Sequence, residues 1–185
     1  MGCFGFDVLA GEDVATGPII RIDPGGQAEV VAEGLYFPNG MIVDGTRLIV
    51  AETLGNRLSV FDVAANGTLG ERRDWARFGD LPTASTYQEC VQQVNVAADG
   101  ISQPDAEDAV WVADAANHRA VRVAEGGEIL EDIQVDPPEH VYATALGGPD
   151  GHTLHLASAP GFGVFDAAQR QARLLATRVN VPLRS

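Results

Sequence analysis

The feature that most constrains the fold of this chain is an internal repeat. The segment Leu48–Val60 aligns with Val110–Arg122, because each consists of an apolar strand, an Ala followed by an acid, a turn, an Arg and a second alternating strand. A third copy begins at Leu154, so the copies start 62 and 44 residues apart. A recurrence of about 40–45 residues with several short strands per unit is typical of β-propeller blades. The sequence therefore predicts an all-β propeller.

Alternating apolar and polar residues outside the repeat predict further strands. They occur at Ile19–Ile22, Ala28–Ala32, Ile129–Val135 and Leu174–Val181. Only Asp166–Arg173 has helix-forming character over a comparable length. The 21 Gly and 10 Pro residues suit the many turns of such a fold.

The longer of the two steps between copies indicates an insertion. Its excess of 18 residues falls in Leu81–Val96, where Pro82 and a run of polar residues interrupt the alternation. We expect an inserted loop at about 81–96, with a short helix around Tyr87–Gln92. Two interpretations of this loop stay open, a lid over a site and a variable surface excursion.

Charge and composition exclude several classes of function. The chain carries 26 acidic and 12 basic residues, a net charge of −14, which repels nucleic acid and anionic membrane surfaces. All the basic residues are Arg, so a Schiff-base lysine and a P-loop lysine are excluded. Cys3 and Cys90 are too few for a disulfide framework. With no long apolar run and no signal-like start, we expect a cytoplasmic protein.

Two polar residues precede the strands that begin successive blades. Asn39 lies nine residues before Leu48 and Asp99 lies eleven residues before Val110, and each is followed by Gly and an apolar stretch. Because the inner strands of propeller blades surround one channel, we expect these side chains to converge. Amide and carboxylate oxygens are ligands for Ca²⁺, Mg²⁺ or Mn²⁺. The alternative, that Asn-Gly and Asp-Gly simply form turns, also stays open.

Several landmarks in order along the chain carry a family resemblance. They are Phe37–Gly40, Leu48–Thr53, Asp99–Ile101, Val110–Asp114 and Leu146–Leu154. In these the chain resembles the senescence-marker-protein/gluconolactonase/regucalcin family from about Phe4 to Val181. The resemblance implies a six-bladed propeller with one divalent cation in its channel, calcium first, with zinc, manganese or magnesium as alternatives. It implies that Asn39 and Asp99 are two metal ligands and that Asp99 is the catalytic general base.

The chain also departs from that family. A Glu-Gly-Pro segment that supplies a third ligand and an Arg-x-Asn-Asp segment that holds substrate are both missing from the sequence. At 40–45 residues per blade, 185 residues make about four blades. We therefore expect residues 1–185 to form a single partial propeller domain that lacks the family's N-terminal third.

The predicted function is a divalent-metal-dependent hydrolase of sugar lactones or related small esters, truncated and weakly active. The alternative is a non-catalytic propeller fragment that serves as a binding or interaction module. The expected partners are a small sugar lactone and other copies of the chain, which would associate through exposed blade faces. The substrate-binding residues are not assigned.

The acids that end the first strand of two repeats have a structural interpretation. We expect Glu52 and Asp114 to accept hydrogen bonds in turns, from Arg57 and Arg119 of the same repeats. Trp111 alternates with apolar neighbours and is expected in the core.

Overall fold

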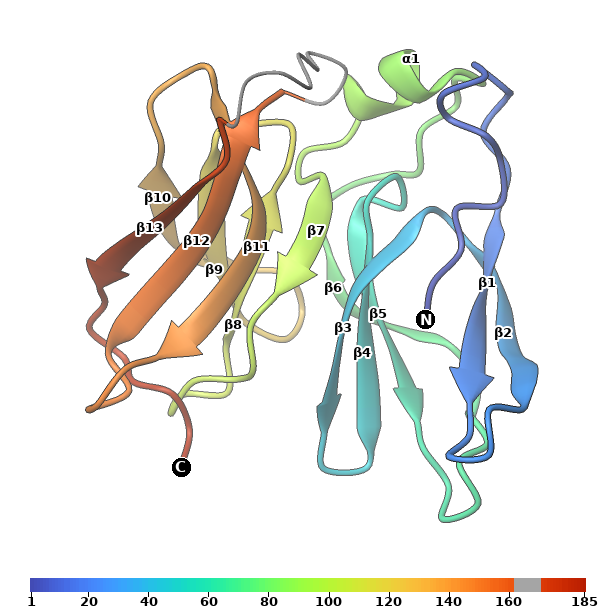
Figure 1. The fold of residues 1–185 in the computed structure, drawn as a ribbon, viewed down its shortest axis with the longest axis horizontal. Coiled ribbons are helices and arrows are strands. Elements are labelled where there is room, and N and C mark those ends of the chain that lie inside the picture. Colours follow the sequence, from blue (N-terminus) through green and yellow to red (C-terminus); the bar gives the residue numbers. More distant parts are fainter. Residues whose placement is uncertain (162–170) are drawn as a thin grey trace.

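The computed structural model describes residues 1–161 and 171–185 and is almost entirely β (Figure 1). The first sheets are built from β1 (Gly17–Ile22), β2 (Ala28–Leu35), β3 (Pro38–Asp44), β4 (Arg47–Glu52), β5 (Arg57–Asp62) and β6 (Arg73–Arg77). After α1 (Tyr87–Val91) come β7 (Ala98–Ile101), β8 (Val110–Asp114), β9 (Arg119–Val123) and β10 (Ile129–Gln134). The last sheet contains β11 (Glu139–Gly147), β12 (Thr153–Pro160) and β13 (Arg173–Arg178).

The strands form four antiparallel sheets in the described part of the chain. Their orders are β1-β2, β3-β4-β5-β6, β7-β8-β9-β10 and β11-β12-β13, so each sheet is built from consecutive strands. The sheets stand side by side, with β7 between β3 and β11 (Figure 1). Blade-like sheets in chain order confirm the all-β, incomplete propeller that the repeat predicts.

Most of the sequence-predicted elements outside the repeat are confirmed. β1 and β2 cover the first two alternating segments, β10 covers the third up to Gln134, and α1 covers the expected short helix up to Val91. The terminal strand is shorter than expected: β13 ends at Arg178, and the next residue, Val179, is buried at 5% exposure. The first residues of the helix-forming stretch Asp166–Arg173 lie outside the described residues. No helix of residues 1–161 or 171–185 is long and apolar enough to cross a membrane.

Each pair of neighbouring sheets encloses its own apolar core. Ile19, Leu35, Val50 and Phe61 fill the core between the β1-β2 sheet and the β3–β6 sheet. Ile49, Leu58, Trp75, Val96, Val112 and others fill the core between β3–β6 and β7–β10. Trp111, fully buried as expected, packs with Leu146, Leu154 and Leu156 between the last two sheets. Burial on both faces explains why β4 and β8, which lie inside these sheets, carry four consecutive apolar residues each.

The outer faces of the two end sheets are exposed. On the last sheet, Ala143, Ala145, Ala157 and Ala176 face solvent, and Leu174 is 75% exposed. On the first sheet, Val30 is 51% exposed. These are the faces on which a blade normally receives a neighbour.

The repeated acid–Arg pairs hold the blades internally, as the sequence indicates. Glu52 is fully buried and accepts hydrogen bonds from Arg57 Nε at 2.9 Å and from the Tyr36 backbone N–H at 2.7 Å. Asp114 is also fully buried and accepts from Arg119 Nε at 2.8 Å and from the Ala97 N–H at 3.0 Å. Each acid therefore ties the strand it ends to the backbone that enters the same blade.

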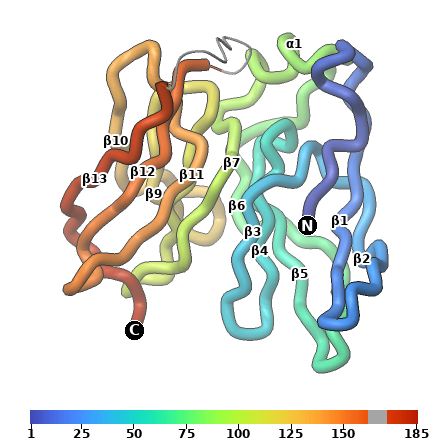
Figure 2. The backbone as a smooth tube through the Cα atoms, viewed as in Figure 1, coloured from blue at the N-terminus to red at the C-terminus, as the bar shows by residue number. Residues whose placement is uncertain are grey.

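The C-terminal residues run back beneath the blades, at the end of the sheets opposite α1 (Figure 2). The Leu183 N–H donates to the Gly151 carbonyl at 2.9 Å, and the Arg184 N–H donates to Pro104 at 3.2 Å. The Arg184 guanidinium pairs with Asp44 and with Asp108. This C-terminal segment, residues 179–185, thereby connects three successive sheets.

Candidate functional site

Asn39 and Asp99 occupy the same place in two successive blades. In the β3/β4 ladder, Pro38 pairs with Glu52 and Met41 with Val50, which leaves Asn39-Gly40 in an irregularity of the register. In the β7/β8 ladder, Ala98 pairs with Asp114 and Ile101 with Val112, which leaves Asp99-Gly100 in the matching irregularity. A bulge of this kind re-aims a side chain out of the normal alternation.

The two strands approach closely at this level. A Cβ added to Gly40 would lie 2.4 Å from the Asp99 carbonyl oxygen and 2.9 Å from Gly100 Cα. Thr53 also connects the strands: the Asn39 amide Nδ2 donates to Thr53 Oγ1 at 3.3 Å, and that hydroxyl donates to the Ala98 carbonyl at 2.8 Å. Asn39 and Asp99 therefore lie at the same end of adjacent inner strands.

Tyr142 holds the equivalent place in the third blade. In the β11/β12 ladder, Val141 pairs with Ser158 and Ala143 with Ala157, and the register shifts between them at Tyr142. A Cβ added to Gly100 would lie 2.6 Å from Ala143 Cα and 2.9 Å from the Tyr142 carbonyl oxygen. Asp99 thus has Asn39 on one side and Tyr142 on the other. The sequence reasoning missed Tyr142, because it lies twelve residues before Leu154, a spacing found in neither of the other blades, and is followed by Ala instead of Gly.

The inserted segment packs against this end of the sheets. Thr86 caps α1 by accepting from the Glu89 N–H at 3.3 Å, and Cys90, 2% exposed, packs with Phe37 and Leu54. The Tyr87 ring centroid lies 6.0 Å from that of Phe37. α1 is drawn beyond the ends of the sheets, on the side where β3 and β7 begin (Figure 1). The segment is therefore anchored by buried side chains at the candidate site.

Tyr87 interacts electrostatically with two residues of the candidate site. Burial, followed by the neighbouring Tyr142 hydroxyl and Asp99 carboxylate, raises the pKa of Tyr87. Burial also raises the pKa of Asp99 to about 7, against the opposing effect of a hydrogen bond from the Gly100 backbone N–H. An acid in this range changes protonation state near neutral pH, as a general acid or base must.

The donor atoms at the site suit a hard cation. The Asn39 amide uses its nitrogen toward Thr53, so its oxygen is the atom that would be offered to an ion. Asp99 would add carboxylate oxygens, and amide and carboxylate oxygens are the ligand types that Ca²⁺ and Mg²⁺ prefer. Within residues 1–161 and 171–185, no three His, Cys, Asp or Glu side chains group as a metal cluster. Two protein ligands leave most of a six- to eight-coordinate shell to water or substrate.

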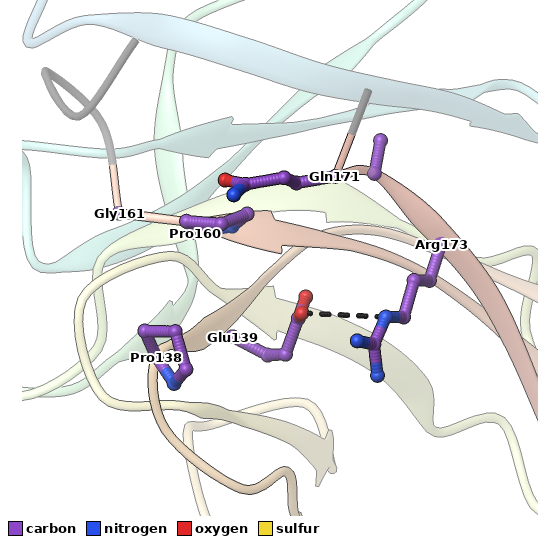
Figure 3. A pocket seen from close by; sticks show the side chains of 7 residues that line it. Pro138, Glu139, Pro160, Gly161, Gln171 and Arg173 are labelled. Atoms are coloured by element: carbon purple, nitrogen blue, oxygen red, sulfur yellow. Dashed lines mark ion pairs between the residues drawn. The ribbon is translucent and has the colours of Figure 1, made fainter. Parts of the chain in front are cut away.

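A separate cavity of about 490 Å³ lies at the edge of the last sheet. Its lining includes Pro138, Glu139, Pro160, Gly161, Gln171 and Arg173 (Figure 3). The Glu139 carboxylate pairs with Arg173 Nε across it at 3.6 Å. The lining contains neither Asn39 nor Asp99, but the carbonyl of its Pro160 accepts a hydrogen bond from the Tyr142 hydroxyl.

The four antiparallel sheets and the row of bulged inner strands define an incomplete β-propeller. The family model described as the SMP-30/gluconolactonase/LRE-like region matches residues 1–160. The chain therefore belongs to the SMP-30/gluconolactonase/LRE-like family.

Solved structures confirm the fold. A luciferin-regenerating enzyme is 18% identical with a TM-score of 0.68, and the match covers 92% of this chain and 54% of that one. A calcium-binding regucalcin from Agrobacterium tumefaciens is 21% identical with a TM-score of 0.66, over 91% of this chain and 54% of that one. A gluconolactonase from Xanthomonas campestris is 20% identical with a TM-score of 0.52, over 80% and 43%. This chain thus spans about half the length of these propellers.

Proposed function

We propose that the chain carries part of a lactonase site and hydrolyses sugar lactones or related small esters with the help of a divalent cation at Asn39 and Asp99. The observation that supports this most is the placement of a carboxyl with a pKa of about 7 beside an amide, in matching bulges of adjacent blades. Membership of a family named for a gluconolactonase supports the reaction class. The calcium-binding regucalcin among the similar structures supports calcium over zinc, manganese or magnesium.

Asn39 and Asp99 would have different roles in the hydrolysis. A cation held by Asn39 and Asp99 would supply Lewis acidity to the lactone carbonyl. The Asp99 carboxylate would accept a proton as a water molecule attacks the carbonyl carbon. The ring C–O bond then breaks, and the departing ring oxygen takes up that proton to give the hydroxy acid.

Hydrolysis of D-glucono-1,5-lactone tests this proposal directly. The purified chain is assayed with EDTA and with added Ca²⁺, Mn²⁺, Mg²⁺ or Zn²⁺, alongside Asp99→Asn and Asp150→Asn. Asp150 lies in the turn between β11 and β12 at the opposite end of the blade, so its variant controls for the loss of one surface charge. Cation-dependent turnover that disappears only in Asp99→Asn supports the proposal. Turnover that is equal in both variants would contradict it.

The exposed end sheets favour a second role, association with other copies of this chain. The outer face of the last sheet presents Ala157, Ala176 and the 75% exposed Leu174 in a position where a propeller blade normally has a neighbour. An interaction module would need these faces and would not need Asp99. Light scattering on the wild-type chain, together with the lactone assay, separates the two roles.

A further inference from the structure

We propose that Tyr142 binds the substrate in this site and accepts a hydrogen bond from a ring hydroxyl, so that the site selects hydroxylated lactones over unsubstituted ones. This inference rests on the proposed lactonase function and deepens it. It assigns to the third blade a role different from that of the first two.

The placement of Tyr142 follows from the sheet registers. The irregularities at Asn39, Asp99 and Tyr142 fall at corresponding points of three ladders, so the three residues occupy the same position in three successive blades. These three positions are called the ring of bulged positions. Gly100 lies against the backbone of β11: a Cβ added to Gly100 would be less than 3 Å from Ala143 Cα and from the Tyr142 carbonyl oxygen. β11 and β7 are therefore in close contact at this level. A substrate that reaches Asp99 therefore lies next to Tyr142.

Asp99 lies between two residues of different chemistry, Asn39 and Tyr142. On one side, Asn39 offers an amide oxygen, which suits a cation. On the other side, Tyr142 offers a phenol, which is a poor ligand for a hard cation beside carboxylates. The chemistry therefore places the cation toward Asn39 and the body of the substrate toward Tyr142.

The hydrogen bonding of Tyr142 determines what it can recognise. Its hydroxyl donates to the Pro160 carbonyl at 3.2 Å. A phenol has one hydrogen, so with that hydrogen committed the oxygen acts toward any further partner as an acceptor. The carbonyl and ring oxygens of a lactone are acceptors themselves, whereas ring hydroxyls are donors. The partner that Tyr142 fits is therefore a hydroxyl group on the substrate.

Tyr87 supports this side of the site from the inserted segment. Its hydroxyl interacts electrostatically with both Tyr142 and Asp99, and α1 is held in place by the buried Cys90. A second phenol therefore lies near enough to Tyr142 and Asp99 to interact with both.

Tyr142→Phe tests the inference, because it removes the acceptor and keeps the ring. The pair of substrates is D-glucono-1,5-lactone and δ-valerolactone, which has the same ring without hydroxyls. We expect KM for gluconolactone to rise about 3- to 10-fold, the change that one neutral hydrogen bond gives. We expect kcat for gluconolactone, and both constants for δ-valerolactone, to stay within about twofold. Tyr36→Phe is the matched control, because it removes the same atom from a tyrosine outside the ring of bulged positions.

Equal changes on the two lactones would overturn the inference, since a purely structural role of Tyr142 affects both substrates alike. If the wild-type chain hydrolyses neither lactone with any cation, the proposed function fails, and the inference is decided by binding alone. Calorimetric titration with D-glucono-1,5-lactam, the amide analogue with the same hydroxyls, then gives the result. Binding that weakens 3- to 10-fold in Tyr142→Phe and not in Tyr36→Phe would support the inference. No binding by the wild type, or equal binding by both variants, would overturn it.

Discussion

Gly40 lies directly against the backbone of Asp99, with room for a hydrogen and no room for a methyl group. A Cβ at Gly40 would stand 2.4 Å from the Asp99 carbonyl oxygen, and this oxygen cannot move away without moving β7. Adjacent blades are thus in backbone contact at the level of the candidate site. The absence of a side chain at Gly40 sets how near Asn39 and Asp99 can be.

Gly40→Ala should therefore destabilise the chain. Forcing a methyl group into an occupied space costs about 1–3 kcal/mol, and here the neighbour is backbone rather than a flexible side chain. Gly147→Ala is the matched control, because an added Cβ there meets nothing within 4 Å. Urea unfolding of both variants measures the difference. A Gly40→Ala midpoint equal to that of Gly147→Ala would show that β3 and β7 are farther apart than described.

Asp99→Asn should stabilise the cation-free chain above neutral pH. Burial raises the pKa of Asp99 to about 7, whereas an unfolded Asp titrates near 3.9. Between these values the unfolded state loses its proton first, so the wild type loses stability as pH rises from about 4 to about 7. We expect the variant to gain about 1–3 kcal/mol over the wild type at pH 8 and nothing at pH 3.5. Urea unfolding in EDTA at several pH values checks this, and a constant difference would contradict it.

Divalent-cation binding should be weak and should be lost in Asp99→Ala. The site offers one carboxylate and one amide oxygen from the described residues, far fewer than the six to eight oxygens of a strong calcium site. Removing the carboxylate leaves a neutral amide that cannot compete with water for the ion. Calorimetry with Ca²⁺, Mn²⁺ and Zn²⁺ measures both proteins. Equal heats would place any binding elsewhere on this acidic surface.

Arg184→Ala should weaken the chain more at neutral pH than in acid. A side-chain hydrogen bond from Arg47 lowers the pKa of Asp44, burial opposes that shift, and Arg184 lowers the pKa further. An acid with a depressed pKa contributes stability above its unfolded pKa, and the contribution disappears as pH falls through the folded value. The difference between wild type and variant in urea midpoint should therefore shrink between pH 5 and pH 3. A difference that is independent of pH would assign the effect of Arg184 to packing.

Self-association, if it uses the last sheet, should depend on Leu174. Leu174 is 75% exposed in the single chain and would be buried in a blade-to-blade contact. A charged residue at this position makes that contact unfavourable, because the charge would be buried. We expect Leu174→Glu to shift the chain toward monomer in light scattering. Leu9→Glu is the control, because Leu9 is similarly exposed, at 80%, but precedes the first strand. An equal effect of the two variants would point to general solubility rather than to this face.

The sequence was sufficient to predict the blades because each repeat carries its own signals. Strand alternation, a turn and an acid–Arg pair are local, and the buried Glu52 and Asp114 occupy the places that their spacing indicates. The role of Asn39 and Asp99 remains a prediction, but their equivalence was visible because each is followed by Gly.

The position of Tyr142 could not be predicted from the sequence, because Tyr142 lacks the signals that Asn39 and Asp99 share. It is followed by Ala143, and its spacing to the next strand differs from the spacings in the other blades. Its place depends on where β11 slips against β12, and such a slip is set by pairing between strands. The docking of α1 through Cys90 and the return of the C-terminal segment beneath three sheets are likewise contacts between distant parts of the chain, which no local pattern encodes.

The row formed by Gly40, Gly100 and Ala143 has an evolutionary consequence. Neighbouring blades meet there through backbone atoms and one methyl group, so the spacing of the inner strands does not depend on the side chains beside them. An amide, a carboxyl and a phenol occupy the adjacent positions of three blades on the same scaffold. A single substitution at any of these positions can therefore change the chemical groups presented at this end of the inner strands while leaving the spacing of the strands unaltered, so this architecture can acquire new polar groups one residue at a time.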